Sequence, residues 1–162
     1  MSRRLAAAVA AAATRAATLA AGVVASAVLV AVVLGACGAP AAPAAPRPPP
    51  AKVLQVNATG EPVELGAILE PGHVTVVDYW ATWCGACELV DERLMATIGD
   101  EPAIVVRKID VGDGETPVAR QHQVGALPHV RLYDRAGNLR HVLTGNDAFA
   151  AGDLARALAA EP

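Results

Sequence analysis

Acidic residues are absent from the first 36 positions of this 162-residue chain. The only charged side chains there are those of Arg3, Arg4 and Arg15, and residues 16–34 form an uncharged apolar run. A basic start followed by such a run is typical of an export signal or a membrane anchor and excludes this segment from a folded core. We therefore expect the rest of the chain to lie outside the cytoplasm, held to a membrane.

The apolar run ends in the sequence Leu34-Gly35-Ala36-Cys37. This stretch resembles the lipobox of bacterial lipoproteins, which implies that residues 1–36 are a lipoprotein-type signal peptide and that Cys37 carries a lipid. The alternative is a single uncleaved transmembrane anchor, because a helix over residues 16–34 would nearly cross the hydrocarbon at about 1.5 Å per residue. Residues 37–50, the lipidated cysteine followed by Pro and Ala, are expected to form a semi-extended linker.

Positive charge is scarce after Cys37. Ten basic and sixteen acidic residues follow it, which gives a net charge of −6. This balance disfavours nucleic acid as a partner, because binding to a phosphate backbone relies on Lys and Arg. No internal repeat is present, and we expect one folded domain over residues 51–162 that acts as a monomer.

Strand-like and helical patterns alternate along this domain. The run Val74–Trp80 is typical of a buried strand, and Val90, Leu94 and Ile98 share one face of a predicted helix over Cys87–Ile98. The remaining expected elements are strands at Val53–Asn57 and Val63–Leu65 joined as a hairpin, a helical turn at Gly66–Leu69, a strand at Ala103–Ile109, a helix at Glu115–Gln123, a hairpin of Val130–Tyr133 and Leu139–Leu143, and a helix over about Ala150–Ala159. This order predicts an α/β domain with Cys84 and Cys87 at its first strand-to-helix junction.

The sequence lacks the additional residues that a haem-attachment or zinc site at Cys84 and Cys87 would need. Haem attachment requires a histidine directly after the second cysteine, where Glu88 stands. A structural zinc site needs four ligands, and the histidines are scattered singly at positions 73, 122, 129 and 141, so we expect no metal and no bound cofactor. A structural disulfide usually joins more distant segments, since short loops restrain the unfolded chain least. A redox-active pair is therefore favoured.

Position gives the two thiols different roles. A cysteine at a helix N-terminus faces unpaired N–H groups and the positive end of the helix dipole, which favour the nucleophilic thiolate. We expect Cys84 to be the exposed attacking thiol. Cys87, one turn into the helix, is expected to be the more buried resolving thiol that attacks the mixed disulfide and forms the Cys84–Cys87 disulfide.

The stretch VVDYWATWCGACE closely resembles the active-site segment of thioredoxins, and the likeness extends over about residues 51–161. The resemblance implies a thioredoxin fold, a central mixed β-sheet flanked by helices, here with an N-terminal β-hairpin extension. It also implies catalytic roles for Asp78, a buried acid that helps Cys87 exchange its proton, and for Lys108, the partner of that acid. The substrate-binding residues that it implies are Trp83, Gly85, Ala86, Leu127, Pro128 and Gly145.

Two of these positions have simpler interpretations. Burial in an apolar strand is expected to raise the pKa of Asp78 and make it a proton shuttle, but the acid could also serve only to pair with Lys108. The resemblance predicts a cis bond before Pro128 that leaves the Leu127 backbone free to bind a substrate strand. The alternative is a trans proline that opens a strand.

Ala86 departs from the family, which usually has proline there. The change adds a backbone N–H at the helix start, and we expect a less reducing potential than that of a cytosolic thioredoxin. The stretches WATWC and ATGEPVEL resemble the tethered thioredoxin-like proteins of cytochrome c maturation. The stretches CGAC and LPHVRLYDRAGN resemble the exported C-terminal domain of the transmembrane thiol:disulfide interchange proteins.

The sequence thus favours an exported oxidoreductase that reduces protein disulfides and receives electrons from a membrane thiol relay. The alternatives are a disulfide oxidase or isomerase, and a non-catalytic, redox-responsive binding module.

Overall fold

The computed structural model describes residues 48–162. The proposed signal peptide, Cys37 and most of the linker lie outside these residues. Within residues 48–162, no helix combines the length and the apolar character needed to cross a membrane.

Five strands form one mixed sheet in the order β1-β3-β2-β4-β5. They are β1 (Val53–Gln55), β2 (Val74–Trp80), β3 (Ile104–Asp110), β4 (His129–Tyr133) and β5 (Leu139–Thr144). Strands β1 and β2 pair with β3 in parallel, whereas β4 is antiparallel to both β2 and β5. The central strands β2 and β3 are almost completely buried, which explains their nearly continuous apolar sequences.

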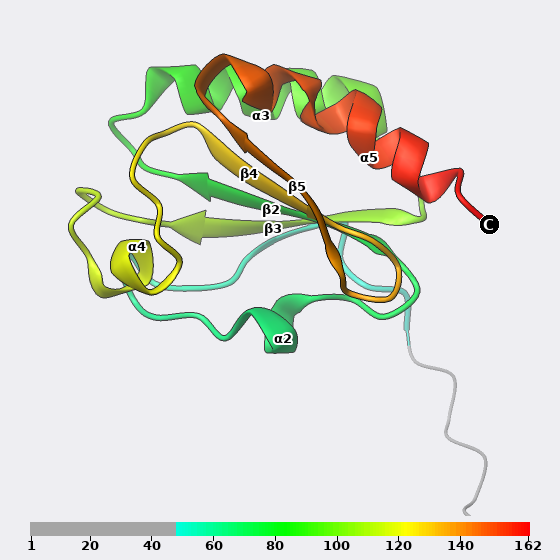
Figure 1. The fold of residues 1–162 in the computed structure, drawn as a ribbon, viewed down its shortest axis with the longest axis horizontal. Coiled ribbons are helices and arrows are strands. Elements are labelled where there is room, and N and C mark those ends of the chain that lie inside the picture. Colours follow the sequence, from blue (N-terminus) through cyan, green and yellow to red (C-terminus); the bar gives the residue numbers. More distant parts are fainter. Residues whose placement is uncertain (1–47) are drawn as a thin grey trace, which may run out of the picture. The chain divides into compact units, whose positions relative to one another are not determined.

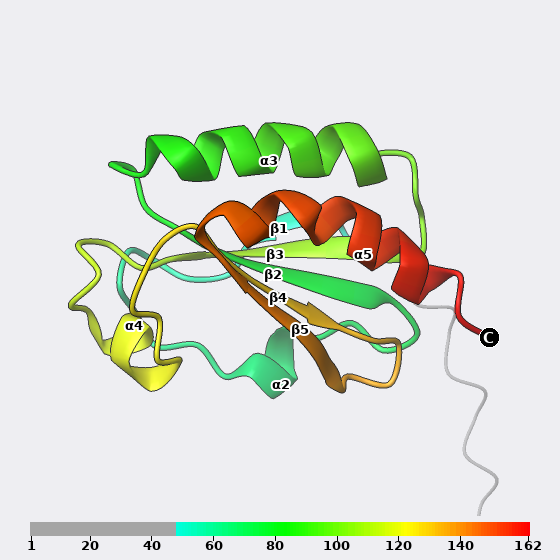
Figure 2. The ribbon, with the colours of Figure 1, turned by 45° about the horizontal axis from the view of Figure 1, so that its top comes forward.

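Helices cover both faces of the sheet (Figures 1 and 2). Helix α3 (Gly85–Ile98) and helix α5 (Ala151–Ala159) lie on one face, and the short helices α2 (Leu65–Ile68) and α4 (Pro117–Gln121) lie on the other. A 3₁₀ helix, η1 (Gly145–Ala150), connects β5 to α5. Helices α3 and α5 approach closely at Gly152, where a Cβ atom would lie 2.7 Å from the Cβ of Thr97.

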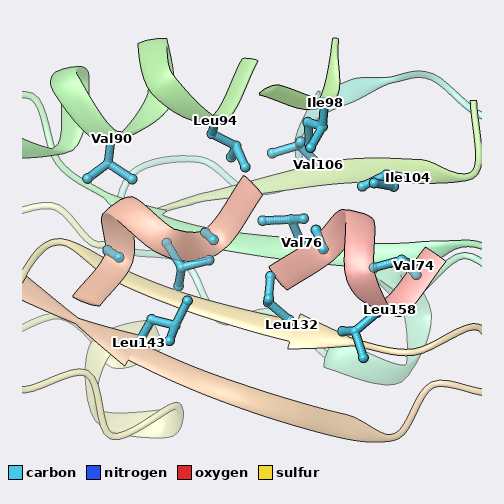
Figure 3. Packing of buried hydrophobic residues seen from close by; sticks show 14 residues of the cluster. Val74, Val76, Val90, Leu94, Ile98, Ile104, Val106, Leu132, Leu143 and Leu158 are labelled. Carbon is cyan, nitrogen blue, oxygen red and sulfur yellow. The ribbon is translucent and has the colours of Figure 1, made fainter. Parts of the chain in front are cut away.

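Aliphatic side chains fill the space between the sheet and the α3/α5 layer (Figure 3). Val90, Leu94 and Ile98 point from α3 toward the sheet, as their spacing predicts. Their partners include Val74, Val76, Ile104, Val106, Leu132, Leu143 and Leu158. These contacts fix α3 on the sheet, and with it the cysteine pair at its start.

The predicted N-terminal hairpin is wrong. Strand β1 does not pair with residues 63–65 but lies parallel to β3, with Val53 opposite Val106. Val63 is buried without being in a strand, and its N–H donates to the Gln121 side chain. Pro62 has no N–H to offer a β-ladder, and the open edge of β3 supplies β1 with a full set of partners. Alternating apolar residues predict that a segment forms a strand, but they do not predict which strand it pairs with.

The other predicted elements are present with shifted ends, and the predicted central mixed sheet flanked by helices is confirmed. Helix α4 is shorter than expected: Thr116 caps its N-terminus, accepting from the Ala119 N–H, and Pro117 is its first residue. Gln123, placed inside this helix by the sequence, has a φ of 55°, which a helix does not allow. Gly145 follows β5 as the first residue of η1.

Candidate redox site

Cys84 and Cys87 form a disulfide at the N-terminus of α3, with a Cα–Cα distance of 5.3 Å. Cys84 is the N-cap residue, and its Sγ accepts a hydrogen bond from the Cys87 N–H at 3.2 Å. The first N–H groups of a helix have no partner within the helix, and they carry the positive end of its dipole. The sulfur of Cys84 therefore sits where negative charge is stabilised.

Both cysteines are buried in this disulfide form. Cys84 is 6% exposed and Cys87 is 3% exposed, so the predicted order holds but the expectation of an exposed Cys84 is wrong here. Both pack in a cluster that includes Tyr79 and Ala81, against which Trp80 and Leu127 also pack. The two residues between the cysteines, Gly85 and Ala86, are exposed to solvent.

Trp83 stands beside the pair as an exposed aromatic surface. Its side chain is 62% exposed, yet its indole N–H donates to the Gly112 carbonyl at 2.6 Å. The Gly112 N–H in turn donates to the Asp110 carboxylate, which also accepts from the Thr59 hydroxyl. This chain of hydrogen bonds holds the ring in place from the C-terminal end of β3, so a partner would meet a fixed apolar face.

Asp78 and Lys108 lie opposite each other on β2 and β3. Lys108 Nζ is 3.4 Å from Asp78 Oδ2, and the Asp78 side chain is 2% exposed. Among the described residues, neither oxygen of Asp78 has an aligned hydrogen-bond donor. Burial raises the pKa of Asp78 to about 6, although the nearby Lys108 ammonium opposes the rise. Asp78 can therefore change protonation near neutral pH.

A cleft of about 360 Å³ is lined by both Lys108 and Cys87. Its lining residues are Trp80, Cys87, Glu88, Asp91, Glu92 and Lys108. The Lys108 ammonium lies over the Trp80 ring, 5.3 Å from its centre, which stabilises the charge of the lysine at the cleft wall. Cys87 thus shares one cleft with the lysine that contacts Asp78.

The remaining predicted residues gather at the start of β4. The Leu127–Pro128 peptide bond is cis, Pro128 is buried, and Leu127 is half-buried against the cluster that contains both cysteines. Gly145, with a φ of 61°, donates its N–H to the Pro128 carbonyl at 2.8 Å. The structure thus packs Leu127 against the cluster that contains the cysteines and joins Pro128 to Gly145, whereas the indole of Trp83 is bonded to Gly112.

Asp91 was missed from the sequence. Its carboxylate lies 2.9 Å from Lys108 Nζ, closer than that of Asp78. The signal that could have found it is its spacing, because residues four apart on a helix are neighbours and Asp91 is four after Cys87. Within residues 48–162, no group of three or more His, Cys, Asp or Glu side chains is arranged to hold a metal ion.

Comparison with known proteins shows what the chain is similar to in sequence and in fold. Residues 66–158 match the family model described as Thioredoxin. The chain is 34% identical over 80 residues to a thioredoxin of Mycolicibacterium smegmatis, covering 47% of this chain and 70% of that protein. A thioredoxin of Echinococcus granulosus is 29% identical over 84 residues, covering 52% and 78%. The crystal structure of reduced Schistosoma mansoni thioredoxin superposes with a TM-score of 0.51 at 20% identity, over 67% of this chain and 99% of that one.

Proposed function

The chain belongs to the thioredoxin family and is a thiol-disulfide oxidoreductase, and from this premise we propose that it reduces protein disulfides outside the cytoplasm while tethered to a membrane. The observation that carries the proposal is the Cys84–Cys87 disulfide at the start of α3, next to the cleft that Lys108 lines. A dithiol at this position can take up and return two electrons without a bound cofactor.

In the reducing direction, the Cys84 thiolate attacks one sulfur of the substrate disulfide. The substrate S–S bond breaks, a mixed disulfide with Cys84 forms, and the second substrate sulfur leaves as a thiolate. Cys87 then gives its proton to the Asp78 carboxylate and attacks Cys84, which releases the other substrate sulfur. Substrate leaves with two reduced sulfurs, and the protein is left in the disulfide form.

A dithiol donor must return two electrons to Cys84–Cys87 before the next cycle. Outside the cytoplasm we propose that a membrane thiol relay is this donor, by a second round of disulfide exchange. The direction is supported by the residues between the cysteines, Gly85 and Ala86, which include no histidine. Because Ala86 adds an N–H at the helix start, we expect a potential above about −270 mV, the value typical of thioredoxin. A redox titration against glutathione measures it.

The location is proposed from the sequence before residue 48. The apolar run of residues 16–34 and Cys37 support a lipid anchor, and the Pro- and Ala-rich residues 38–50 support a spacer between membrane and domain. Labelled fatty acid should enter the wild-type protein and not the Cys37→Ala variant. A protein that stays membrane-bound and unlabelled would instead have a single transmembrane anchor.

Trapping tests the activity and the partner together. In the Cys87→Ala variant the mixed disulfide on Cys84 cannot be resolved, so substrate proteins should accumulate as dithiothreitol-sensitive adducts. The Cys84→Ser variant, which retains the other thiol, is the matched control and should trap far less. The wild type should reduce a model disulfide substrate, and Cys84→Ser should abolish turnover.

The trapped partners distinguish the candidate substrates, which are an apocytochrome, another oxidoreductase or a misfolded protein. Partners that are found oxidised in cells lacking this protein would support reduction, and partners found reduced there would show an oxidase. Partner binding that persists in Cys84→Ser without any turnover in the wild type would show a binding module and overturn the proposal.

A further inference from the structure

One ammonium group in this protein is shared by two carboxylates. Lys108 Nζ lies 2.9 Å from Asp91 Oδ1 and 3.4 Å from Asp78 Oδ2. The side chain of Asp78 is 2% exposed, and that of Asp91 is 35% exposed. Asp91 Oδ1, which faces the ammonium, is buried, but the rest of the Asp91 carboxylate reaches solvent. Lys108 is therefore closer to the partly solvated acid than to the fully buried one.

The fold creates this arrangement from three elements. Asp78 and Lys108 are register partners on the parallel strands β2 and β3, and both belong to the face covered by α3. Asp91 comes from α3, one turn after Cys87, and lines the same cleft as Cys87 and Lys108. The helix thus places a second acid beside the lysine, in the same cleft.

We propose that Asp91 is a positioning residue, which holds the Lys108 ammonium partly away from Asp78 and so sets the pH range in which Asp78 accepts the proton of Cys87. This inference rests on the proposed function, because it assigns a control to the resolving step. Asp91 touches neither sulfur in this role and acts through Lys108.

Charge explains the direction of the effect. Burial is the largest cause that raises the pKa of Asp78, Lys108 lowers it, and the negative charge of Asp91 raises it further. Neutralising Asp91 would remove one like charge and free Lys108 to move toward Asp78. Both changes favour the Asp78 carboxylate, so Asp78 would remain able to accept a proton at lower pH.

Among the acids of residues 48–162 on the elements that pack near Asp78, Asp91 is the one with an ion pair to Lys108 besides Asp78 itself. On α3, Glu88 and Glu92 line the same cleft. From β4, the residue opposite Asp78 is Val130, which carries no charge. The charged α5 residues Asp153 and Arg156 lie in ion pairs with Arg93 and Glu101. Cys87 titrates only when reduced, and the disulfide form removes it from the measurement.

The first measurement is the titration of Asp78 in the full-length disulfide form, followed by the ¹³C shift of its carboxyl carbon. In Asp91→Asn the midpoint should fall by about one pH unit, and in Asp91→Glu it should stay near that of the wild type. Glu92→Gln is the matched control, because it removes one negative charge from the same cleft without an ion pair to Lys108. It should move the midpoint by much less than Asp91→Asn.

The second measurement is the rate at which a preformed mixed disulfide on Cys84 is resolved, as a function of pH. The acid limb of this profile should shift to lower pH in Asp91→Asn by the same amount as the Asp78 midpoint. A merely structural role of Asp91 would change the rate by one factor at every pH and leave the midpoint in place.

The inference is overturned if Asp91→Asn and Glu92→Gln move the Asp78 midpoint equally, or if neither moves it. It is also overturned if the midpoint falls while the acid limb stays fixed. Failure of the proposed function gives a different result: the wild type then turns over no disulfide, while the carboxyl titration, which needs no substrate, still decides whether Asp91 controls Asp78.

Discussion

The face of the sheet beneath α3 and α5 and the face that carries α2 and α4 bury their polar groups differently. On the α3/α5 face, which carries the aliphatic cluster, the carboxylate of Asp78 is buried and its oxygens lack an aligned hydrogen bond among residues 48–162. The cation close to it, Lys108, is shared with Asp91. Charge on this face is poorly satisfied, which suits a group that must change protonation.

On the α2/α4 face, polar groups form a connected network. The Tyr79 hydroxyl lies 2.8 Å from His122 Nδ1, and His122 Nε2 lies 2.8 Å from the Val63 carbonyl oxygen. His129 packs edge-on against the Tyr79 ring and accepts a hydrogen bond from Arg131. Each partner is satisfied by another, so this face has the character of a structural network.

The difference predicts opposite responses of the two faces to pH. Burial raises the pKa of Asp78 to about 6, so the folded state holds its proton more tightly than the unfolded chain. Burial, helped by Arg131, lowers the pKa of His129 to about 4, so the folded state holds that proton less tightly. Stability from Asp78 is therefore lost as pH rises from about 4 to 6, and stability from His129 is lost as pH falls from about 6.5 to 4. The two slopes largely cancel in the wild type.

The largest expected effect is that of Asp78→Asn, which removes the contribution of Asp78 to the pH dependence of stability. Because the buried charge is removed, the free energy of unfolding at pH 7 should rise by about 3 kcal/mol, and the gain should shrink to near zero at pH 4. Urea unfolding at pH 4, 5, 6 and 7 measures it. Exposed Asp147→Asn is the control and should change little at any pH. A gain that is the same at all four values would contradict the buried charge as its cause.

A smaller effect is expected from His129→Gln, which removes the opposite contribution of His129 to the pH dependence of stability. Without an imidazole to protonate, lowering the pH from 7 to 5 should leave the variant about 2 kcal/mol more stable, relative to its own stability at pH 7, than the same change leaves the wild type. The same urea series measures this difference, whatever the substitution costs at pH 7. His141→Gln, at a half-buried position on the edge strand β5, serves as the control. If the pH dependence of the free energy of unfolding is the same in His129→Gln and the wild type, His129 does not cause the loss of stability at low pH that is attributed to it.

The smallest expected effect concerns one hydrogen bond of the network on the α2/α4 face, that between Tyr79 and His122. Tyr79→Phe removes the hydroxyl that contacts His122 and should lower the free energy of unfolding at pH 7 by about 1 kcal/mol. Tyr133→Phe is the matched control, since Tyr133 is also buried but its hydroxyl has no hydrogen bond within residues 48–162. Equal losses in the two variants would show that the Tyr79–His122 contact contributes nothing specific.

Much of the fold could be predicted because its signals are local. The runs that became β2 and β3, the spacing of Val90, Leu94 and Ile98, and the hairpin of β4 and β5 depend on neighbours a few residues away. The place of β1 could not be predicted in this way, since a short strand pairs with whichever edge the fold leaves open. The same holds for Gln123, whose backbone ends α4 earlier than the apolar pattern suggests.

The sequence alone determined that two cysteines lie at a helix start, after a buried strand that carries an acid, because strand and helix periodicity are properties of short segments. Tertiary structure decided what surrounds them. Only the register of β2 on β3 and the rotation of α3 bring Asp78, Lys108 and Asp91 together. Likewise, histidines that are single in the sequence converge on Tyr79. Charges interact through distances in space, and those distances exist only once the sheet and its helices have packed.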